Sequence, residues 1–141
     1  MSTQSAIVQF LFPAPAPRSA AGIVNWWEAR RLHYNLIVGA AGLFSIAVWT
    51  VLSWLPPRWP DGHYIPLGIV VVYGIMANVC YSLGACAEIL LQKVWGWKLL
   101  PTGPVLFRMG LTFSVGLTLL PVPLAGWDWT VRLTRYVLQL L

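Results

Sequence analysis

The stretch LIVGAAGLFSIAVWTVLSWL, Leu36 to Leu55, decides the fold class of this chain. Its 20 residues include no charged side chain. In a helix that rises about 1.5 Å per residue they extend about 30 Å, which is the thickness of the hydrocarbon core of a bilayer. Pro56 and Pro57 follow directly and end the helical pattern, because proline lacks the backbone N–H that a helix needs. We therefore predict a membrane-spanning helix over about 35–55.

The composition of the whole chain also indicates a membrane protein. The 141 residues suit one domain, and 58% of them are hydrophobic while only 9% are charged. Soluble proteins carry about 25% charged residues, so the 9 basic and 4 acidic side chains are too few for a soluble surface. The net charge of +5 favours contact with anionic lipid headgroups. No basic patch with interleaved aromatic residues lies in a soluble segment, so we expect no nucleic-acid partner.

Two further uncharged runs predict two further spans. A run of 24 residues that begins at Tyr64 predicts a span over about 64–92. A run of 19 residues that begins at Met109 predicts a third span over about 105–121, ended by prolines. We therefore expect an all-α transmembrane fold, a small helical bundle of three membrane-spanning helices.

The tail WDWTVRLTRYVLQLL predicts one more helix over about 128–141. It is too short and too charged to cross the bilayer in the usual way. Arg132 and Arg135 share one helical face, which favours an amphipathic helix on the membrane surface with Trp127 and Trp129 as anchors. The alternative is a short fourth crossing, joined to the third span through PVPLAG.

The first 24 residues form a lead to the membrane domain, which covers residues 25–141. The lead holds a short apolar patch and then PAPAP, residues 13–17, a pattern typical of an extended spacer. The patch is too short to span, and no basic residue precedes it, so a cleaved signal peptide is disfavoured. We expect a flexible or interfacial lead.

The placement of the basic residues predicts the orientation. Six of them precede the first span or lie between the second and third, whereas the first loop holds only Arg58. Because lysine and arginine gather on the cytoplasmic side, we expect a cytoplasmic N-terminus. Three spans then leave Arg132 and Arg135 outside, against this rule. That conflict is the best sequence argument for a fourth crossing.

A polar cluster, NWWEARRLHYN, stands directly before the first span. Within it Glu28, Arg31 and Asn35 are spaced i, i+3 and i+7, so they share one face of the helix. Aromatic residues of this kind suit the headgroup level of a membrane. We expect three of them to be interfacial anchors: Trp26, Trp27 and Tyr34.

We expect a charge network at the same boundary. The topology places Glu88, near the end of the second span, and Arg108, at the start of the third, at the depth of Glu28 and Arg31. Charges at a membrane boundary are unfavourable unless they are paired or reach the headgroups. Pairing among these four side chains would clamp three helices together. The alternative is that each arginine reaches separately toward the headgroups.

The second span also carries a polar stripe, because Asn78, Tyr81 and Glu88 fall on one helical face. An asparagine near the midplane needs a partner across the bundle. The candidates for this partner are Ser45, Ser114 and Thr118. Small residues that favour close helix packing are Gly110, Ser114 and Thr118 on the third span, with Gly39 and Gly42 on the first.

Three stretches together resemble one protein family. They are WWEARRLHYN (26–35), ANVCYSLGACAE (77–88) and GPVLFRMGLTFSVGLTLLP (103–121). Their common elements are an acid-arginine-Tyr-Asn cluster, an Asn-Tyr-Gly-Glu pattern and a Gly-Pro-Leu-Phe helix entry. The chain is similar in these to small uncharacterised bacterial polytopic integral membrane proteins. The resemblance implies a multi-helix membrane fold and no catalytic residue.

The sequence shows no pattern of enzyme chemistry, and we expect no cofactor or metal. His33 and His63 lie at opposite ends of the first hairpin, so they cannot share a metal inside the bilayer. Cys80 and Cys86 are six residues apart and lie on different faces of one helix. No Ser-His-Asp set and no phosphate-binding glycine loop occur.

The expected function, for a small protein of a bacterial inner membrane, is a structural or interaction role, as a homo-oligomer or as an accessory subunit of a membrane complex. The small number of helices, the few polar groups within the spans and the nine tryptophans motivate this hypothesis. The alternative is a small oligomeric transporter or pore that uses Asn78, Tyr81 and Glu88.

Overall fold

The computed structural model describes residues 19–58, 65–95 and 102–141, with the Trp95 side chain left out. These residues form helices and no strand, which confirms the all-α fold. The helices are α2 (Ala20–Trp54), α3 (Leu67–Trp95), α4 (Gly103–Leu119) and α5 (Pro121–Leu140).

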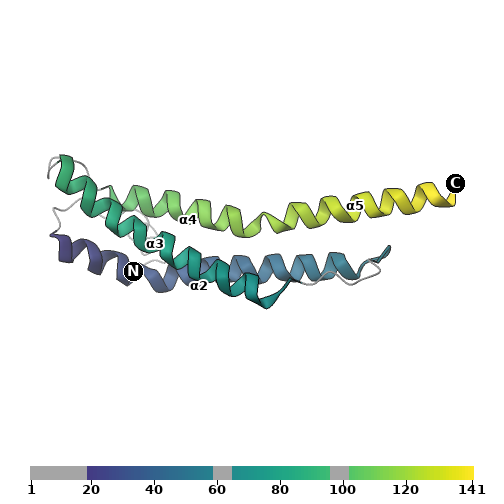
Figure 1. Cartoon of the computed structure of the whole chain (residues 1–141), viewed down its shortest axis with the longest axis horizontal. Coiled ribbons are helices and arrows are strands. Elements are labelled where there is room, and N and C mark those ends of the chain that lie inside the picture. The colour runs from purple at the N-terminus through teal and green to yellow at the C-terminus, as the bar shows by residue number, and fades with distance from the viewer. Residues whose placement is uncertain (1–18, 59–64, 96–101) are drawn as a thin grey trace, which may run out of the picture.

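The helices form a long bundle in which α2 and α4 run in the same direction and α3 runs against them (Figure 1). Three helical segments are long and apolar enough to cross a membrane: Ala20–Trp54, Leu67–Val94 and Gly103–Leu140. Their side chains are mostly exposed, as those of lipid-facing helices are. The chain is an integral membrane protein with three candidate spans, as predicted.

The first helix begins earlier than expected. Ser19 is its N-cap, and the Ser19 hydroxyl accepts a hydrogen bond of 3.2 Å from the backbone N–H of Gly22. The helix therefore includes the whole polar cluster and extends well beyond the predicted span. The PAPAP spacer lies outside the described residues, as do Arg18, His63 and Lys98.

The third span is longer than expected because α5 continues α4 almost in line (Figure 1). Pro121 begins α5 at a position where its missing N–H can be tolerated, and Leu120 between the two helices keeps helical dihedrals of −55° and −35°. The prolines therefore bend this helix slightly instead of ending the span. The tail forms the expected C-terminal helix, α5, and this helix continues the third span instead of turning back beside it.

The first half of α5 packs against the C-terminal end of α2. The guanidinium of Arg132 donates to the backbone oxygens of Leu52 at 3.0 Å and Pro57 at 2.6 Å, and it pairs with Asp128 at 3.1 Å. The indole of Trp129 donates to the backbone oxygen of Pro56 at 3.2 Å. Arg132 thus supplies donors and positive charge to the carbonyl end of α2, where a helix lacks partners.

Hydrogen bonds between helices hold the middle of the bundle together. The hydroxyl of Tyr34 on α2 lies 2.8 Å from the Ser114 hydroxyl on α4. The hydroxyl of Tyr73 on α3 lies 2.6 Å from that of Thr118, and Ser45 on α2 donates to the Thr118 backbone oxygen at 2.7 Å. Each such bond stabilises a membrane bundle by about 1 kcal/mol, so the helices are joined by many small contributions.

The helix α3 covers only part of the bundle. It begins well short of the C-terminal end of α2, so α2 and α5 continue beyond it as a pair (Figure 1). One half of the bundle therefore has three helices and the other half has two. We refer to these as the three-helix half and the two-helix half.

The contacts of Arg132 lead to a stability prediction. Arg132→Gln should lower the free energy of unfolding by about 1–3 kcal/mol, because hydrogen bonds from a charged donor to the end of α2 are lost. Thermal unfolding in detergent measures this difference. Arg135→Gln is the matched control, and it should change stability by less than about 0.5 kcal/mol because Arg135 is exposed. Equal effects of the two variants would contradict the proposed role of Arg132.

Candidate functional site

Three helices meet around one buried carboxylate, that of Glu88 near the end of α3. Its side chain is completely buried. Trp27 of α2 donates its indole N–H to Glu88 Oε2 at 2.7 Å. A buried acid is unfavourable unless it is hydrogen-bonded, so this bond ties α2 to α3 strongly.

The N-terminus of α4 completes the surroundings of Glu88. Gly103 and Pro104 are both buried there, and a methyl group on Gly103 would lie less than 3.0 Å from the Glu88 carboxylate. Its N-cap residue, Thr102, makes no capping hydrogen bond with its side chain. The carboxylate takes the place where a negative charge is favoured by the helix dipole. We call Glu88, Trp27 and Gly103 the carboxylate junction.

Aromatic rings surround the carboxylate junction. The Trp27 ring lies 5.2 Å from that of Tyr81 and 6.0 Å from that of Phe107, both edge to face. Tyr81 also donates its hydroxyl to the Trp27 backbone oxygen at 2.5 Å, and its ring lies 4.6 Å from that of Tyr34. Trp27 and Tyr34 are thus buried core residues, and the prediction that they are interfacial anchors is wrong.

The expected charge network is present only in part. The N-terminal part of α2, the C-terminal part of α3 and the start of α4 meet at one end of the bundle (Figure 1), and these segments hold the four charged residues Glu28, Arg31, Glu88 and Arg108. Arg31 pairs with Glu28 at 2.7 Å, whereas Arg108 donates to the Pro104 backbone oxygen at 3.3 Å. Glu88 does join three helices, but among the described residues its partner is an indole and not a guanidinium.

Glu88 keeps one unused oxygen. Its Oε1 is buried and accepts no hydrogen bond from any described residue. Gly103 leaves space for the carboxylate but supplies no side-chain donor. The junction can therefore hold three helices together. It also retains a buried oxygen, Glu88 Oε1, that can accept a hydrogen bond.

Two polar contacts join α2 and α3 beside the junction. Arg31 donates to the Ser82 hydroxyl at 3.1 Å. One turn farther along, Asn35 donates to the side-chain oxygen of Asn78 at 3.2 Å, and Asn78 donates to the Gly74 backbone oxygen at 3.1 Å. We call this line of contacts the α2–α3 seam.

The partner predicted for Asn78 is wrong. Asn35, which the sequence placed in the polar cluster, takes that role. The three candidates have other partners: Ser114 binds Tyr34, Ser45 binds the Thr118 backbone, and the Thr118 hydroxyl binds Tyr73. The small residues do pack as expected at one point, because a methyl group on Gly42 would lie 3.6 Å from the Thr118 side chain.

The three residues of the α3 stripe lie in different surroundings. Asn78 lines the open seam, whereas Tyr81 is buried among aromatic rings and Glu88 lies in the carboxylate junction. Nearby, Cys80 and Cys86 are both exposed and unbridged. No group of three or more His, Cys, Asp or Glu that could hold a metal occurs in residues 19–58, 65–95 and 102–141.

Two residues of the carboxylate junction, Trp27 and Gly103, were not predicted from the sequence. A signal for Trp27 was present. The buried residues of α2 are spaced 4, 7, 4 and 7 apart, the repeat of a helix that packs along one seam: Ile23, Trp27, Tyr34, Val38 and Ser45. For Gly103 the only signal is its position before Pro104 at a helix start, which does not indicate a carboxylate.

The Trp27–Glu88 bond can be tested directly. Trp27→Phe should destabilise the protein by about 1–3 kcal/mol because it leaves the buried carboxylate without its donor. The matched control is Trp49→Phe, whose buried indole N–H has no described acceptor. The free energy of unfolding is measured for each variant alone and in combination with Glu88→Leu. We expect a coupling energy between positions 27 and 88 and none between positions 49 and 88. A coupling energy near zero between positions 27 and 88 would show that the Trp27–Glu88 bond does not stabilise the fold.

The close approach of Gly103 leads to a second test. Gly103→Ala should destabilise the protein by about 1–3 kcal/mol, because the methyl group displaces the Glu88 carboxylate, which is fully buried and bound by Trp27. Gly116→Ala on the same helix should be neutral or stabilising by about 0.5–1 kcal/mol, because nothing lies near its added methyl group. Thermal unfolding in detergent separates the two variants. A stable Gly103→Ala protein would show that the carboxylate can move away.

Comparisons with known proteins assign neither a family nor a function to this chain. No protein-family model, no curated protein and no solved structure matches this chain at the significance threshold. The resemblance of the three sequence stretches to small bacterial membrane proteins therefore stays a prediction. What is established is the class of the chain, an integral membrane protein with an all-α bundle.

Proposed function

We propose that the chain is a structural or interaction subunit of a bacterial inner membrane, acting as a homo-oligomer or as an accessory subunit of a membrane complex. The observation that carries this proposal is the unequal bundle. The three-helix half is joined by the carboxylate junction and by hydrogen bonds between helices. The two-helix half presents large apolar side chains of α2 and α5 to its surroundings.

The exposed side chains of the two-helix half suit a further helix. Val51 and Trp54 of α2 are 59% and 67% exposed, and Leu124 and Trp127 of α5 are 53% and 72% exposed. Helices in membranes associate through close van der Waals packing, and α3 does not extend far enough along α2 to provide it here. A helix of a second copy or of another membrane protein would complete this half.

The proposed orientation places the carboxylate junction on the cytoplasmic side. Arg30, Arg31 and Arg108 lie at that end, in accord with the preference of basic residues for the cytoplasm. Arg132 lies at the opposite end, but it is bound to the backbone of α2. Its position is therefore explained by helix packing, which removes the main argument for a fourth crossing.

Cross-linking tests the proposed association. We expect the native complex in lipid nanodiscs to have the mass of a defined homo-oligomer or to contain one other chain. In a background of Cys80→Ser and Cys86→Ser, Val51→Cys in the two-helix half should cross-link. Met109→Cys, which is 67% exposed in the three-helix half, is the matched control and should not. A monomer without a partner would contradict the proposal.

A transporter or pore is the second candidate function, and the unused Oε1 of buried Glu88 supports it. An acid that can bind a proton inside a bundle is a common element of proton pathways. This hypothesis predicts proton or ion flux in proteoliposomes that Glu88→Gln abolishes and that the control Glu28→Gln retains. Absence of flux for protons, ions and small solutes would exclude it.

A further inference from the structure

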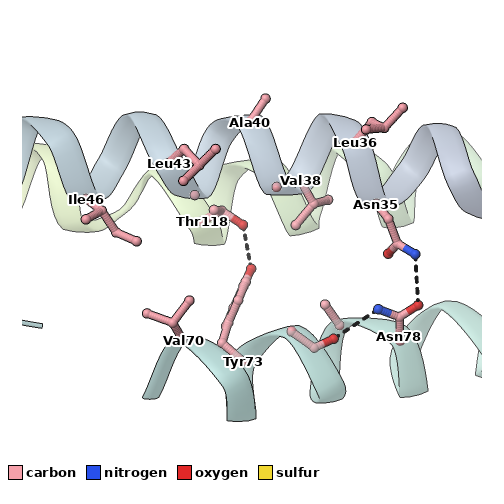
Figure 2. A pocket seen from close by; sticks show the side chains of 14 residues that line it. Asn35, Leu36, Val38, Ala40, Leu43, Ile46, Val70, Tyr73, Asn78 and Thr118 are labelled. Carbon is pink, nitrogen blue, oxygen red and sulfur yellow. Dashed lines mark hydrogen bonds between the residues drawn. The ribbon is translucent and has the colours of Figure 1, made fainter. Parts of the chain in front are cut away.

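The α2–α3 seam opens into a cleft on one side of the polar contacts. The cleft has a volume of about 530 Å³, which lies within the range of about 300–1,000 Å³ of small-molecule sites. Figure 2 shows Asn35 and Asn78 joined at one end, with Ile46 and Val70 at the other. Tyr73 reaches across to Thr118 and forms the floor.

Glycines make the cleft possible. A methyl group on Gly39 or Gly74 would meet no atom within 4 Å, so both positions face open space. The cleft is otherwise lined mainly by apolar side chains such as Leu36, Val38 and Leu43. Apolar side chains of this kind form van der Waals contacts with an apolar occupant from the bilayer, which stabilise it there.

A second hollow adjoins the cleft and is lined at one end by the charged side chain of Arg31. It has a volume of about 670 Å³, shares Gly74 and Asn78 with the cleft, and extends along α3 to Ser82 and Arg31. The Nη2 of Arg31 binds Glu28 and Ser82, and no described residue accepts a hydrogen bond from its Nη1. The guanidinium therefore retains donors for an anion.

The polar groups along the seam follow the order of groups in a phospholipid. Arg31 comes first, the amides of Asn35 and Asn78 follow one turn deeper, and the apolar cleft comes last. From Arg31 to Asn35 the helix rises about 6 Å, and from Asn35 to Ile46 about 16 Å. The second length is close to one leaflet, half of a hydrocarbon core of about 30 Å.

We infer that the α2–α3 seam binds one anionic diacyl phospholipid of the leaflet on the Arg31 side. Arg31 binds the phosphate, and the two asparagine amides lie at the level of the ester groups. One acyl chain fills the cleft and the other follows the hollow along α3. The site does not depend on the proposed function, because it requires neither a second copy nor another protein.

The charge of Glu28 gives a second way to test the lipid site. Its carboxylate pairs with Arg31 at 2.7 Å and is half exposed, so it repels a phosphate at the same place. Removing that charge should therefore strengthen lipid binding, whereas removing the charge of Arg31 should weaken it. A purely structural ion pair would not produce opposite effects on lipid retention.

Native mass spectrometry of the full chain tests the site. The protein is released from nanodiscs with equal amounts of phosphatidylglycerol and phosphatidylcholine, and we expect one phosphatidylglycerol to be retained per chain. Arg31→Gln should reduce this preference about fivefold, as expected for one basic side chain at an anionic lipid, and Glu28→Gln should increase it. Arg135→Gln is the control for charge alone and should have no effect.

The cleft is tested separately by filling it. Gly39→Leu and Gly74→Leu should abolish retention, because their side chains enter the open space that the acyl chain needs. Gly116→Leu, which also enters open space but lies on α4 outside the cleft, should retain the lipid. Thermal unfolding confirms that each variant is folded. Equal retention of the two lipids, or retention unchanged by Arg31→Gln and Gly74→Leu, would overturn the inference.

Discussion

The burial of the Glu88 carboxylate is the constraint on which the three-helix half depends. A buried acid requires a donor and a favourable electric field, and here the donor comes from α2 and the field from the start of α4. Because one group needs both neighbours at once, it fixes the relative positions of three helices. The surrounding aromatic rings exclude water from the carboxylate, which makes its hydrogen bond from Trp27 more important.

In the two-helix half, the main polar contacts are made at the carbonyl end of α2. The end of α2 has backbone oxygens without helical partners, and Arg132 and Trp129 of α5 donate to them. This is possible because the prolines after α4 bend the chain only slightly, so that α5 stays beside α2. The position of Arg132, at the end of the bundle opposite to Arg31 and Arg108, therefore has a structural reason.

Polar side chains within the spans bind either side chains of neighbouring helices or backbone oxygens. The hydroxyls of Tyr34 and Tyr73 are used in contacts between helices. The α2–α3 seam differs from them, because it is open to the bilayer and ends at a guanidinium with unused donors. The bundle thus combines a closed interior with two surfaces that contact its surroundings: the proposed lipid site and the two-helix half.

The sequence by itself determined the class of the fold, the number of spans and the residues that gather at one end of the bundle. Charge and hydropathy are sufficient for this because a bilayer penalises every unpaired charge in its core. The sequence also predicted that Glu28 and Arg31 lie on one face, since residues three apart in any helix are neighbours on its surface. Only the tertiary structure decided that Trp27 and not an arginine binds Glu88, that Asn35 binds Asn78, and that α5 continues α4. These choices depend on helix rotation and on the volume left by Gly103, which residue types and spacing do not specify.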